Sequence, residues 1–260
     1  MSVSALHQPF NQQVNSVQRL TLANINDCMA LQQAVLNSLP PDQDKVHPKT
    51  REKFAQLLAD DSPSTIFGIF EDGQLVAQAI MLCPRTIEEA DLLDFELPGE
   101  PHEISTLAGV LTNPAYEGRG YMSCLVNAWR EEARALGRPH LCGIVTRDNT
   151  KSWSGFMNGG LVIMAAGFDP SDNSTVYLVH RDISRGPALS RSEQSILSES
   201  ARNNEYHPMS YRILTPTVSL EEANEHFAEG YVGVERAYER NRAEVVLVHR
   251  ACLDYYLGIK

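Results

Sequence analysis

Long apolar runs are missing from this sequence, so no segment reaches the length that a membrane-spanning helix needs. The chain has five cysteines, an odd number, and no Cys-x-x-Cys pair, which argues against a disulfide framework and against a cysteine zinc site. Its first fifteen residues hold neither a charged segment nor an apolar core, so residues 1–16 are expected to be a disordered leader and not a signal peptide. These absences predict a cytoplasmic protein without a membrane segment or a bound metal.

Positive charge is scarce, and the net charge is −11. No Lys or Arg occurs between Arg85 and Arg119, whereas that stretch holds Glu88, Glu89, Asp91, Asp94, Glu96, Glu100, Glu103 and Glu117. Nucleic acid is not an expected partner, because phosphate binding needs clustered cations. The acidic connection has two interpretations: it borders a binding site and attracts a cationic substrate, or it is a solvated loop that keeps the protein soluble.

Hydrophobic periodicity and turn residues predict an α/β (α+β) domain over residues 17–183. Asp72-Gly73 is the strongest hairpin signal in the chain. The expected strands are 17–22, 65–71, 74–83, 104–112, 141–146, 161–168 and 175–182, and the expected helices are 25–38, 48–60, 121–136 and 149–159. This order predicts a mixed, mostly antiparallel sheet with helices on both faces.

The C-terminal part of the chain is predicted to be a separate small unit. Residues 184–207 are rich in Ser, Arg, Glu and Asn, which is typical of a linker with room for one polar helix. Residues 208–260 then predict a β-α-β-β unit, whose helix begins after Ser219 and ends at Gly230. A unit so small is marginal alone, so we expect it to pack on the main domain or on a second copy of the chain.

The most informative segment is 105–122, where an apolar strand leads through a glycine loop into a long amphipathic helix. Gly118 and Gly120 permit positive φ and close approach of a ligand, and the helix N-terminus offers free N–H groups to an anion. A P-loop would need Lys-Ser or Lys-Thr where Tyr121 follows, and a dinucleotide fingerprint would need a third glycine near Ser123. An ordinary turn without a ligand is the remaining alternative.

The segment 111–125 resembles the signature motif of the GNAT superfamily of acyl-CoA-dependent N-acetyltransferases. The match rests on Pro114, Tyr116 and the run Gly118-Arg119-Gly120. It departs from the family at Glu117, where the family has Arg or Gln, and at Met122, where it has Gly or Ala. The resemblance implies the GNAT fold and direct transfer of an acetyl group from acetyl-CoA to a primary amine.

Within that resemblance, N–H groups of the loop bind the pyrophosphate of coenzyme A, and the end of the preceding strand pairs with the pantetheine amides. The implied cofactor-binding residues are Val110, Leu111, Thr112, Glu117, Gly118, Arg119, Gly120, Tyr121, Met122, Ser123, Asn149, Ser152 and Phe156.

A second match begins at Asn149, which opens a helix after a buried strand. The family commonly places a tyrosine seven residues later to protonate the departing thiolate, but this chain has Phe156, which has no proton to give. Ser152 and Ser154 are nearby hydroxyls, with Ser152 the catalytic candidate and a solvated or back-bonded serine the alternative. A thiol with a pKa near 8.5 can also leave as thiolate and take its proton from water.

Acetylation of an amine needs a base, because the substrate is largely ammonium at neutral pH. Family members often carry a glutamate at the position of Thr106, and the nearest acid in this chain is Glu103. Glu103 is the expected base, acting through a water that Thr106 holds, while His102 is the competitor. The alternative for both Glu103 and His102 is that each is a loop residue with no role in catalysis. Three further groups are expected to be structural: Cys124, His140 and Cys142.

Two functions from other classes stay open. One is a coenzyme A-binding sensor that has lost catalysis, which Phe156, Glu117 and Met122 favour. The other is an interaction protein that works through its C-terminal unit. For the leading interpretation the acceptor is a small-molecule or peptide amine, expected to be cationic, and a free sheet edge makes a homodimer an expectation.

Overall fold

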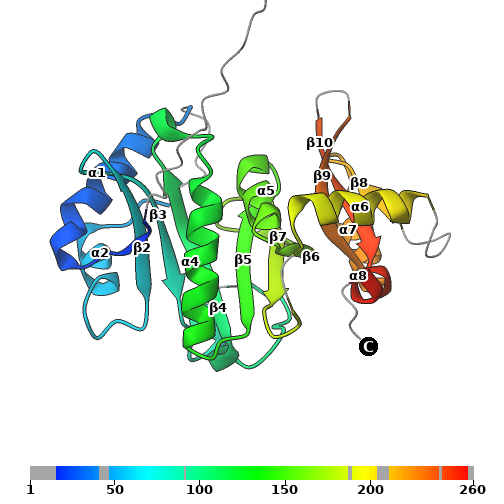
Figure 1. Ribbon diagram of the computed structural model, residues 1–260, viewed down its shortest axis with the longest axis horizontal. Coiled ribbons are helices and arrows are strands. Elements are labelled where there is room, and N and C mark those ends of the chain that lie inside the picture. Colours follow the sequence, from blue (N-terminus) through cyan, green and yellow to red (C-terminus); the bar gives the residue numbers. More distant parts are fainter. Residues whose placement is uncertain are drawn as a thin grey trace, which may run out of the picture.

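A ten-stranded sheet is the framework of the computed structural model, which describes residues 16–40, 47–90, 92–186, 189–203, 211–239 and 242–256 (Figure 1). The strand order is β1-β2-β3-β4-β5-β7-β6-β9-β10-β8. The strands are β1 (Gln18–Arg19), β2 (Thr65–Glu71), β3 (Gln74–Leu82), β4 (Ile104–Thr112), β5 (His140–Thr146), β6 (Val162–Asp169), β7 (Ser174–Asp182), β8 (Tyr211–Leu214), β9 (Tyr231–Glu239) and β10 (Arg242–His249).

Eight α-helices accompany the sheet in the described ranges: α1 (Ile25–Leu36), α2 (Arg51–Leu57), α3 (Ile87–Ala90), α4 (Tyr121–Ala135), α5 (Thr150–Asn158), α6 (Arg191–Arg202), α7 (Leu220–Ala228) and α8 (Arg250–Tyr256). Two predicted elements are shorter than expected. The strand at 17–22 is only β1, because residues 22–24 form a short 3-10 helix. The helix at 48–60 is only α2, because the Thr50 side chain caps it by accepting from the Lys53 N–H at 3.2 Å.

The β4–β5 pair is the parallel step in an otherwise antiparallel sheet, so the predicted mixed, mostly antiparallel sheet is confirmed. The parallel pairing covers only Ile104–Thr106 on β4 and His140–Cys142 on β5. Beyond Thr106 the two strands make no further ladder pairs, and β5 instead pairs along its whole length with β7. The two strands therefore open a gap in the sheet toward their C-terminal ends.

Helices cover both faces of the sheet, as predicted. α4 and α5 lie across the front face in Figure 1, where Leu125, Trp129 and Trp153 are buried in the largest core cluster. α1 and α2 belong to the other face, where Leu31 and Phe54 join a second cluster with side chains of β2, β3 and β4. Burial of these apolar side chains from both faces holds the helices to the sheet.

Local turn chemistry behaves as the sequence predicts. Asp72 and Gly73 have φ values of 49° and 78°, the positive pair that a two-residue hairpin loop with the strand twist requires. α4 ends at Leu136, and Gly137 takes φ 67°, which ends the helix in the left-handed conformation favoured by glycine.

The polar stretch expected to be a linker contains α6, a packed helix. Ser190 accepts a hydrogen bond from the Glu193 N–H, while the Glu193 carboxylate accepts from the Ser190 N–H, so the helix has a complete capping box. Leu197 and Ala201 are fully buried in a third core cluster that includes side chains of β9 and β10. The elements after α6 are β8, α7, β9, β10 and α8, and β9 joins β6 through the pair Ile163–Gly233. The division into domains at 183 and 208 stays a prediction.

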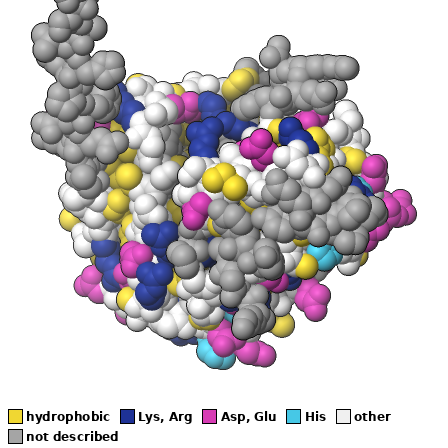
Figure 2. Space-filling model, turned by 45° about the vertical axis from the view of Figure 1, so that its right-hand side comes forward, with side chains coloured by type: hydrophobic (Ala, Val, Ile, Leu, Met, Phe, Trp, Pro, Cys, Tyr) yellow, Lys and Arg dark blue, Asp and Glu magenta, His cyan; other side chains and the backbone are white. Residues whose placement is uncertain are grey.

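The surface mixes charges of both signs. On the face shown in Figure 2, basic and acidic side chains alternate, and hydrophobic side chains form only small patches. Within the described ranges, no helix is long and apolar enough to cross a membrane. The same residues contain no group of three or more His, Cys, Asp or Glu side chains placed to hold a metal ion.

Candidate active site

A cavity of about 410 Å³ opens where β4 and β5 stop pairing. Its walls are residues 106–111 of β4, residues 143–146 of β5 and the start of α5. On the face of the sheet that carries α1 and α2, it extends to Gln32 and to residues 47–49. We call it the β4–β5 cavity.

A bulge in β4 shapes the wall of this cavity. Gln78 of β3 pairs with Leu111, but Ile80 pairs with Ala108, so β4 holds an extra residue between these two pairs. Gly109 lies in the bulge with φ 53°, and a Cβ there would lie 2.8 Å from the Ile80 side chain. Glycine is therefore required at this point, and the bulge redirects β4 along the cavity.

The glycine loop at the end of β4 presents a row of free backbone donors. Gly118 and Gly120 have φ values of 78° and 81°, and Gly120 caps α4. Within the described chain, the backbone N–H groups of Gly118 through Met122 donate no hydrogen bond, whereas the Ser123 N–H donates to the Gly120 carbonyl at 3.1 Å. No atom lies within 4 Å of a Cβ built at Gly118 or Gly120, so a ligand can reach the loop. Such a loop at a helix N-terminus favours an anion.

The charged side chains of the loop are paired with neighbouring elements. Lys151, in the first turn of α5, lies with its Nζ 2.5 Å from the Glu117 carboxylate. Arg119 donates to Glu71 of β2 at 2.6 Å, and the Tyr121 hydroxyl donates to the same carboxylate. Burial and the Glu71 carboxylate raise the pKa of Tyr121 above its usual range. The loop is thus tied to β2 and to α5 by side chains, while its backbone donors stay free.

The start of α5 forms another wall of the cavity. The Asn149 side chain caps the helix by accepting from the Ser152 N–H at 3.1 Å. Ser152 is half-buried and lines the cavity. Ser154 does not, because its hydroxyl donates to the Thr150 carbonyl and accepts from Arg236 of β9 at 3.0 Å.

Phe156 lines the same cavity and is fixed in the core. Its ring meets Trp129 of α4 edge to face, with 6.4 Å between the ring centroids. Trp129 in turn donates its indole N–H to the Ser105 hydroxyl of β4 at 2.9 Å. The position at which the resemblance leads one to expect a tyrosine therefore holds an apolar side chain in the cavity wall.

Two buried polar side chains facing this cavity have no partner among the residues that the structure describes. Thr106 is 4% exposed and Gln78 of β3 is fully buried. The Thr106 hydroxyl and both polar atoms of the Gln78 amide make no hydrogen bond within the described residues, and both residues line the β4–β5 cavity. Buried polar groups are nearly always paired, and leaving one unpaired costs about 1–3 kcal/mol. A ligand in the cavity would supply the missing partners.

Comparison with known families decides what this arrangement belongs to. Residues 16–147 match the family model described as an acetyltransferase (GNAT) domain, and this match spans 132 of the 260 residues. The chain belongs to the GNAT acetyltransferase family. The resemblance carried by the glycine loop is therefore confirmed.

Solved structures of GNAT enzymes resemble this chain at low sequence identity, whereas no curated protein matches it. A probable acetyltransferase from Staphylococcus epidermidis is 14% identical, with a TM-score of 0.48 and coverage of 65% of this chain and 98% of that one. A PaiA N-acetyltransferase from Thermoplasma acidophilum in complex with coenzyme A is 10% identical, with a TM-score of 0.48 and coverage of 64% and 98%. A ribosomal-protein-alanine N-acetyltransferase from Brucella melitensis is 18% identical, with a TM-score of 0.48 and coverage of 65% and 99%.

In this GNAT protein, five of the thirteen predicted cofactor residues line the β4–β5 cavity, and residues 117–123 of the glycine loop do not. Val110, Leu111, Asn149, Ser152 and Phe156 line the cavity, next to the free donors of the loop. Thr112 is paired with Ala77 of β3 and does not line the cavity.

The expected bases are not at the cavity. Glu103 lies in the 3-10 helix before β4, where its carboxylate accepts from the Glu100 N–H at 3.0 Å, and His102 beside it is exposed. Neither lines the cavity. Of the described residues of the acidic connection, those that line the cavity are Ala90, Leu92 and Leu93, all of them apolar.

The ionisable groups that do line the cavity come from segments far apart in the sequence. His47, which precedes α2, lies with its Nε2 2.9 Å from Asp172 in the β6–β7 turn. Asp169 and Lys49 line the cavity close to this pair. Hydrogen bonds from the Ser171 side chain and from backbone N–H groups lower the pKa of Asp169. Sequence reasoning missed these residues because no local pattern places them together.

The cysteines among the described residues are free thiols, and Cys124 and Cys142 differ in burial. Burial raises the pKa of the Cys142 thiol to about 12, which makes it a poor nucleophile at neutral pH. Cys124 is only partly buried and belongs to α4, and neither residue lines the β4–β5 cavity.

The departure at Met122 from the family's small residue is matched by a glycine on the facing helix. A Cβ built at Gly155 of α5 would lie 2.5 Å from Met122 Cγ, so the methionine occupies the space where a side chain would be. Four residues later, a Cβ built at Gly159 would lie 2.5 Å from Val126 Cγ1 of α4. α4 and α5 thus pack closely beside the loop.

Replacing Gly155 with alanine is expected to lower the free energy of unfolding by about 1–2 kcal/mol, because the added methyl overlaps Met122. Helix propensity alone would raise the stability of the alanine variant by about 1 kcal/mol. A decrease in stability would therefore be due to the overlap with Met122. Urea denaturation of Gly155→Ala, Met122→Ala and the double variant would measure it. The double variant should recover most of the loss, and a stabilised single variant would show that the helices are not in this contact.

Proposed function

We propose that this GNAT protein transfers an acetyl group from acetyl-CoA to a primary amine, in a ternary complex and without a covalent enzyme intermediate. The observation that carries the proposal is the row of free backbone donors at Gly118–Met122, in the loop that follows β4, whose residues 106–111 line the β4–β5 cavity. A pyrophosphate fits these donors and the positive end of α4. The pantetheine arm then extends along Val110 and Leu111, with Ser152 on the opposite wall.

Lys151 supports this assignment in spite of Glu117. An acid beside a pyrophosphate is unfavourable, but the Glu117 carboxylate is neutralised by the Lys151 ammonium at 2.5 Å. Arg119 is half-exposed and its charge is paired with Glu71 at 2.6 Å, so the attraction for a pyrophosphate comes from the loop backbone and the start of α4.

Transfer requires a neutral amine, and the His47–Asp172 pair is the group that can remove its proton. We assign the base to His47, acting through a water, in place of Glu103, because His47 lines the cavity and Glu103 does not. The amine nitrogen attacks the acetyl carbon, the carbon–sulfur bond breaks, and the electron pair leaves on sulfur. Phe156 cannot protonate the thiolate, so the proton comes from water or from the Ser152 hydroxyl.

The acceptor is expected to be a cationic amine of a small molecule or a peptide. Asp169 and Asp172 place negative charge at the cavity. Deeper inside, the Gln78 carbonyl and the Thr106 hydroxyl offer hydrogen-bond acceptors that are unused in the described structure. An amine that carries N–H groups would donate hydrogen bonds to these two acceptors.

Isothermal titration with acetyl-CoA, followed by an amine-dependent assay of thiol release, tests the proposal. The expected result is micromolar binding, with release of coenzyme A when a suitable amine is added from a set of spermidine, a free amino acid, and peptides with a free N-terminus or lysine. A folded protein that does not bind acetyl-CoA would overturn the proposal. Binding without turnover for any acceptor would instead favour the coenzyme A sensor, which Phe156 supports.

A further inference from the structure

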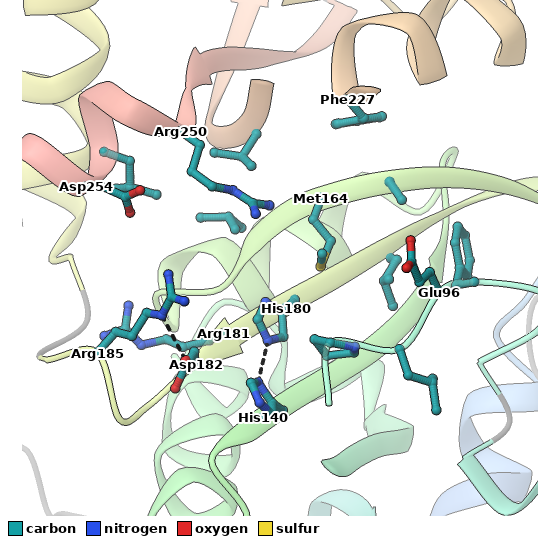
Figure 3. Close-up of a pocket in the computed structure, with 18 of the residues that line it drawn as sticks. Glu96, His140, Met164, His180, Arg181, Asp182, Arg185, Phe227, Arg250 and Asp254 are labelled. Carbon is teal, nitrogen blue, oxygen red and sulfur yellow. Dashed lines mark hydrogen bonds and ion pairs between the residues drawn. The ribbon is translucent and has the colours of Figure 1, made fainter. Parts of the chain in front are cut away.

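A second cavity, of about 480 Å³, lies where the sheet meets the C-terminal elements (Figure 3). Its floor is formed by β5, β6 and β7, and its other walls come from α7, from α8 and from residues 95–98. The segment between α3 and β4 separates the two cavities. Its Leu92 and Leu93 line the β4–β5 cavity, and its residues 95–98 line the second cavity. No residue of the proposed transfer reaction lines this second cavity.

One end of the cavity gathers arginine side chains. Arg250, the first residue of α8, points into the cavity toward His180 (Figure 3). Its guanidinium donates no hydrogen bond and makes no ion pair within the part of the chain that the structure describes. Arg185 is paired with Asp182 at 3.1 Å. Arg181 donates to two backbone carbonyls, and its buried Nε finds no acceptor there.

The charges at this end do not balance. Three guanidinium groups, from Arg181, Arg185 and Arg250, face two carboxylates, from Asp182 and Asp254, whereas Glu96 lines the opposite end of the cavity (Figure 3). Their arrangement leaves a net positive charge in a protein whose overall charge is −11. An anionic group is therefore attracted to this end from solution, and a guanidinium offers it paired hydrogen bonds.

A histidine pair closes the base of the charged end. His140 Nδ1 lies 3.2 Å from His180 Nε2, and the two rings are stacked with centroids 5.4 Å apart. Burial, the neighbouring His140 and the nearby arginines lower the pKa of His180 to about 4, so it is uncharged at neutral pH. His180 thus adds a hydrogen-bonding group without adding a charge.

The rest of the cavity is mainly apolar. Met164 lies on the sheet side and Phe227 of α7 on the other side (Figure 3), and Leu178 and Val232 of β9 also line the cavity. A cavity of a few hundred cubic ångströms with apolar walls and a few convergent polar groups is typical of a small-molecule site, and such sites favour the junction between structural units.

We propose that this second cavity binds a small organic carboxylate. Its carboxylate is held by Arg250, with Arg185 beside it, and its apolar body lies on Met164, Leu178 and Phe227. Because the walls come from the GNAT sheet and from the C-terminal elements, the ligand fastens the two together. The site needs neither coenzyme A nor the amine acceptor.

Isothermal titration of the full chain with phenylacetate tests this site, with acetate and 2-phenylethanol as partial probes. Phenylacetate is expected to bind with a dissociation constant of about 1 mM or tighter. Acetate lacks the apolar body and 2-phenylethanol lacks the charge, so each should bind at least about tenfold more weakly. Saturation with acetyl-CoA should leave the phenylacetate affinity unchanged, which separates this site from the proposed active site.

Arg250→Gln keeps the apolar stem and removes the charge, and it is expected to weaken phenylacetate binding at least about tenfold. The matched control is Arg191→Gln, since Arg191 is an exposed arginine of α6 outside the cavity. Unchanged binding in Arg250→Gln, displacement by acetyl-CoA, or no saturable binding to the folded wild type at millimolar phenylacetate would each overturn the proposal.

Discussion

Replacing Gly120 with glutamate is expected to weaken acetyl-CoA binding by at least about a hundredfold. The substitution places a carboxylate among the free N–H groups at the start of α4. Two like charges about 4 Å apart near a protein surface repel by about 4 kcal/mol, and about 1.4 kcal/mol corresponds to tenfold in affinity. A Cβ built at position 120 meets no atom within 4 Å outside the adjoining residues, so the new side chain begins in open space. Isothermal titration with acetyl-CoA measures the effect.

Gly137→Glu is the matched control for this prediction. Gly137 follows the other end of α4, also has positive φ, and also has open space around its Cβ position. Both substitutions put a non-glycine residue in a left-handed conformation, at a cost of about 1–2 kcal/mol in stability. Only Gly120→Glu should lose acetyl-CoA binding. Equal affinities in the two variants would remove the glycine loop from the proposed pyrophosphate site.

Replacing Gln78 with methionine is expected to raise stability and to impair use of the acceptor. Methionine has nearly the same size but removes a fully buried amide whose two polar atoms have no partner in the described structure. The free energy of unfolding should rise by about 1 kcal/mol or more, because no desolvated polar group remains unpaired. The KM for the amine should rise about three- to tenfold, the equivalent of one lost hydrogen bond.

Urea denaturation without ligand and steady-state kinetics with a turned-over amine check the two halves of this prediction. Gln74→Met is the matched control, because Gln74 begins the same strand and is exposed, so neither quantity should change. The affinity for acetyl-CoA should stay the same in both variants. A Gln78→Met protein that is less stable than the parent would show that the amide already stabilises the unliganded protein, which contradicts the prediction.

Local features of the chain were predictable because they depend on neighbouring residues. The Asp72-Gly73 turn, the glycine loop before α4 and the helix end at Gly137 each follow from a few dihedral angles that glycine permits. The loop that we propose as the cofactor end of the site was therefore predictable from the sequence, together with the missing hydroxyl at Phe156.

Elements that depend on distant partners were less predictable. α6 has few apolar residues, and its buried Leu197 and Ala201 acquire their role only from β9 and β10. The same reason explains Glu103, whose place next to β4 in the sequence suggested a base. In the structure, its carboxylate is bound by the Glu100 N–H away from the cavity.

The sequence by itself determined the family, the mixed sheet and the glycine loop proposed to bind an anion, because signature spacing and hydrophobic periodicity are local properties. Only the tertiary structure decided which polar groups face the β4–β5 cavity. The register of β3 on β4 and the bulge at Gly109 place Gln78 and Thr106 there, and the packing of distant loops brings His47 to Asp172. Strand pairing and loop contacts are long-range, so the residues that would select and activate the acceptor have no shared pattern along the chain.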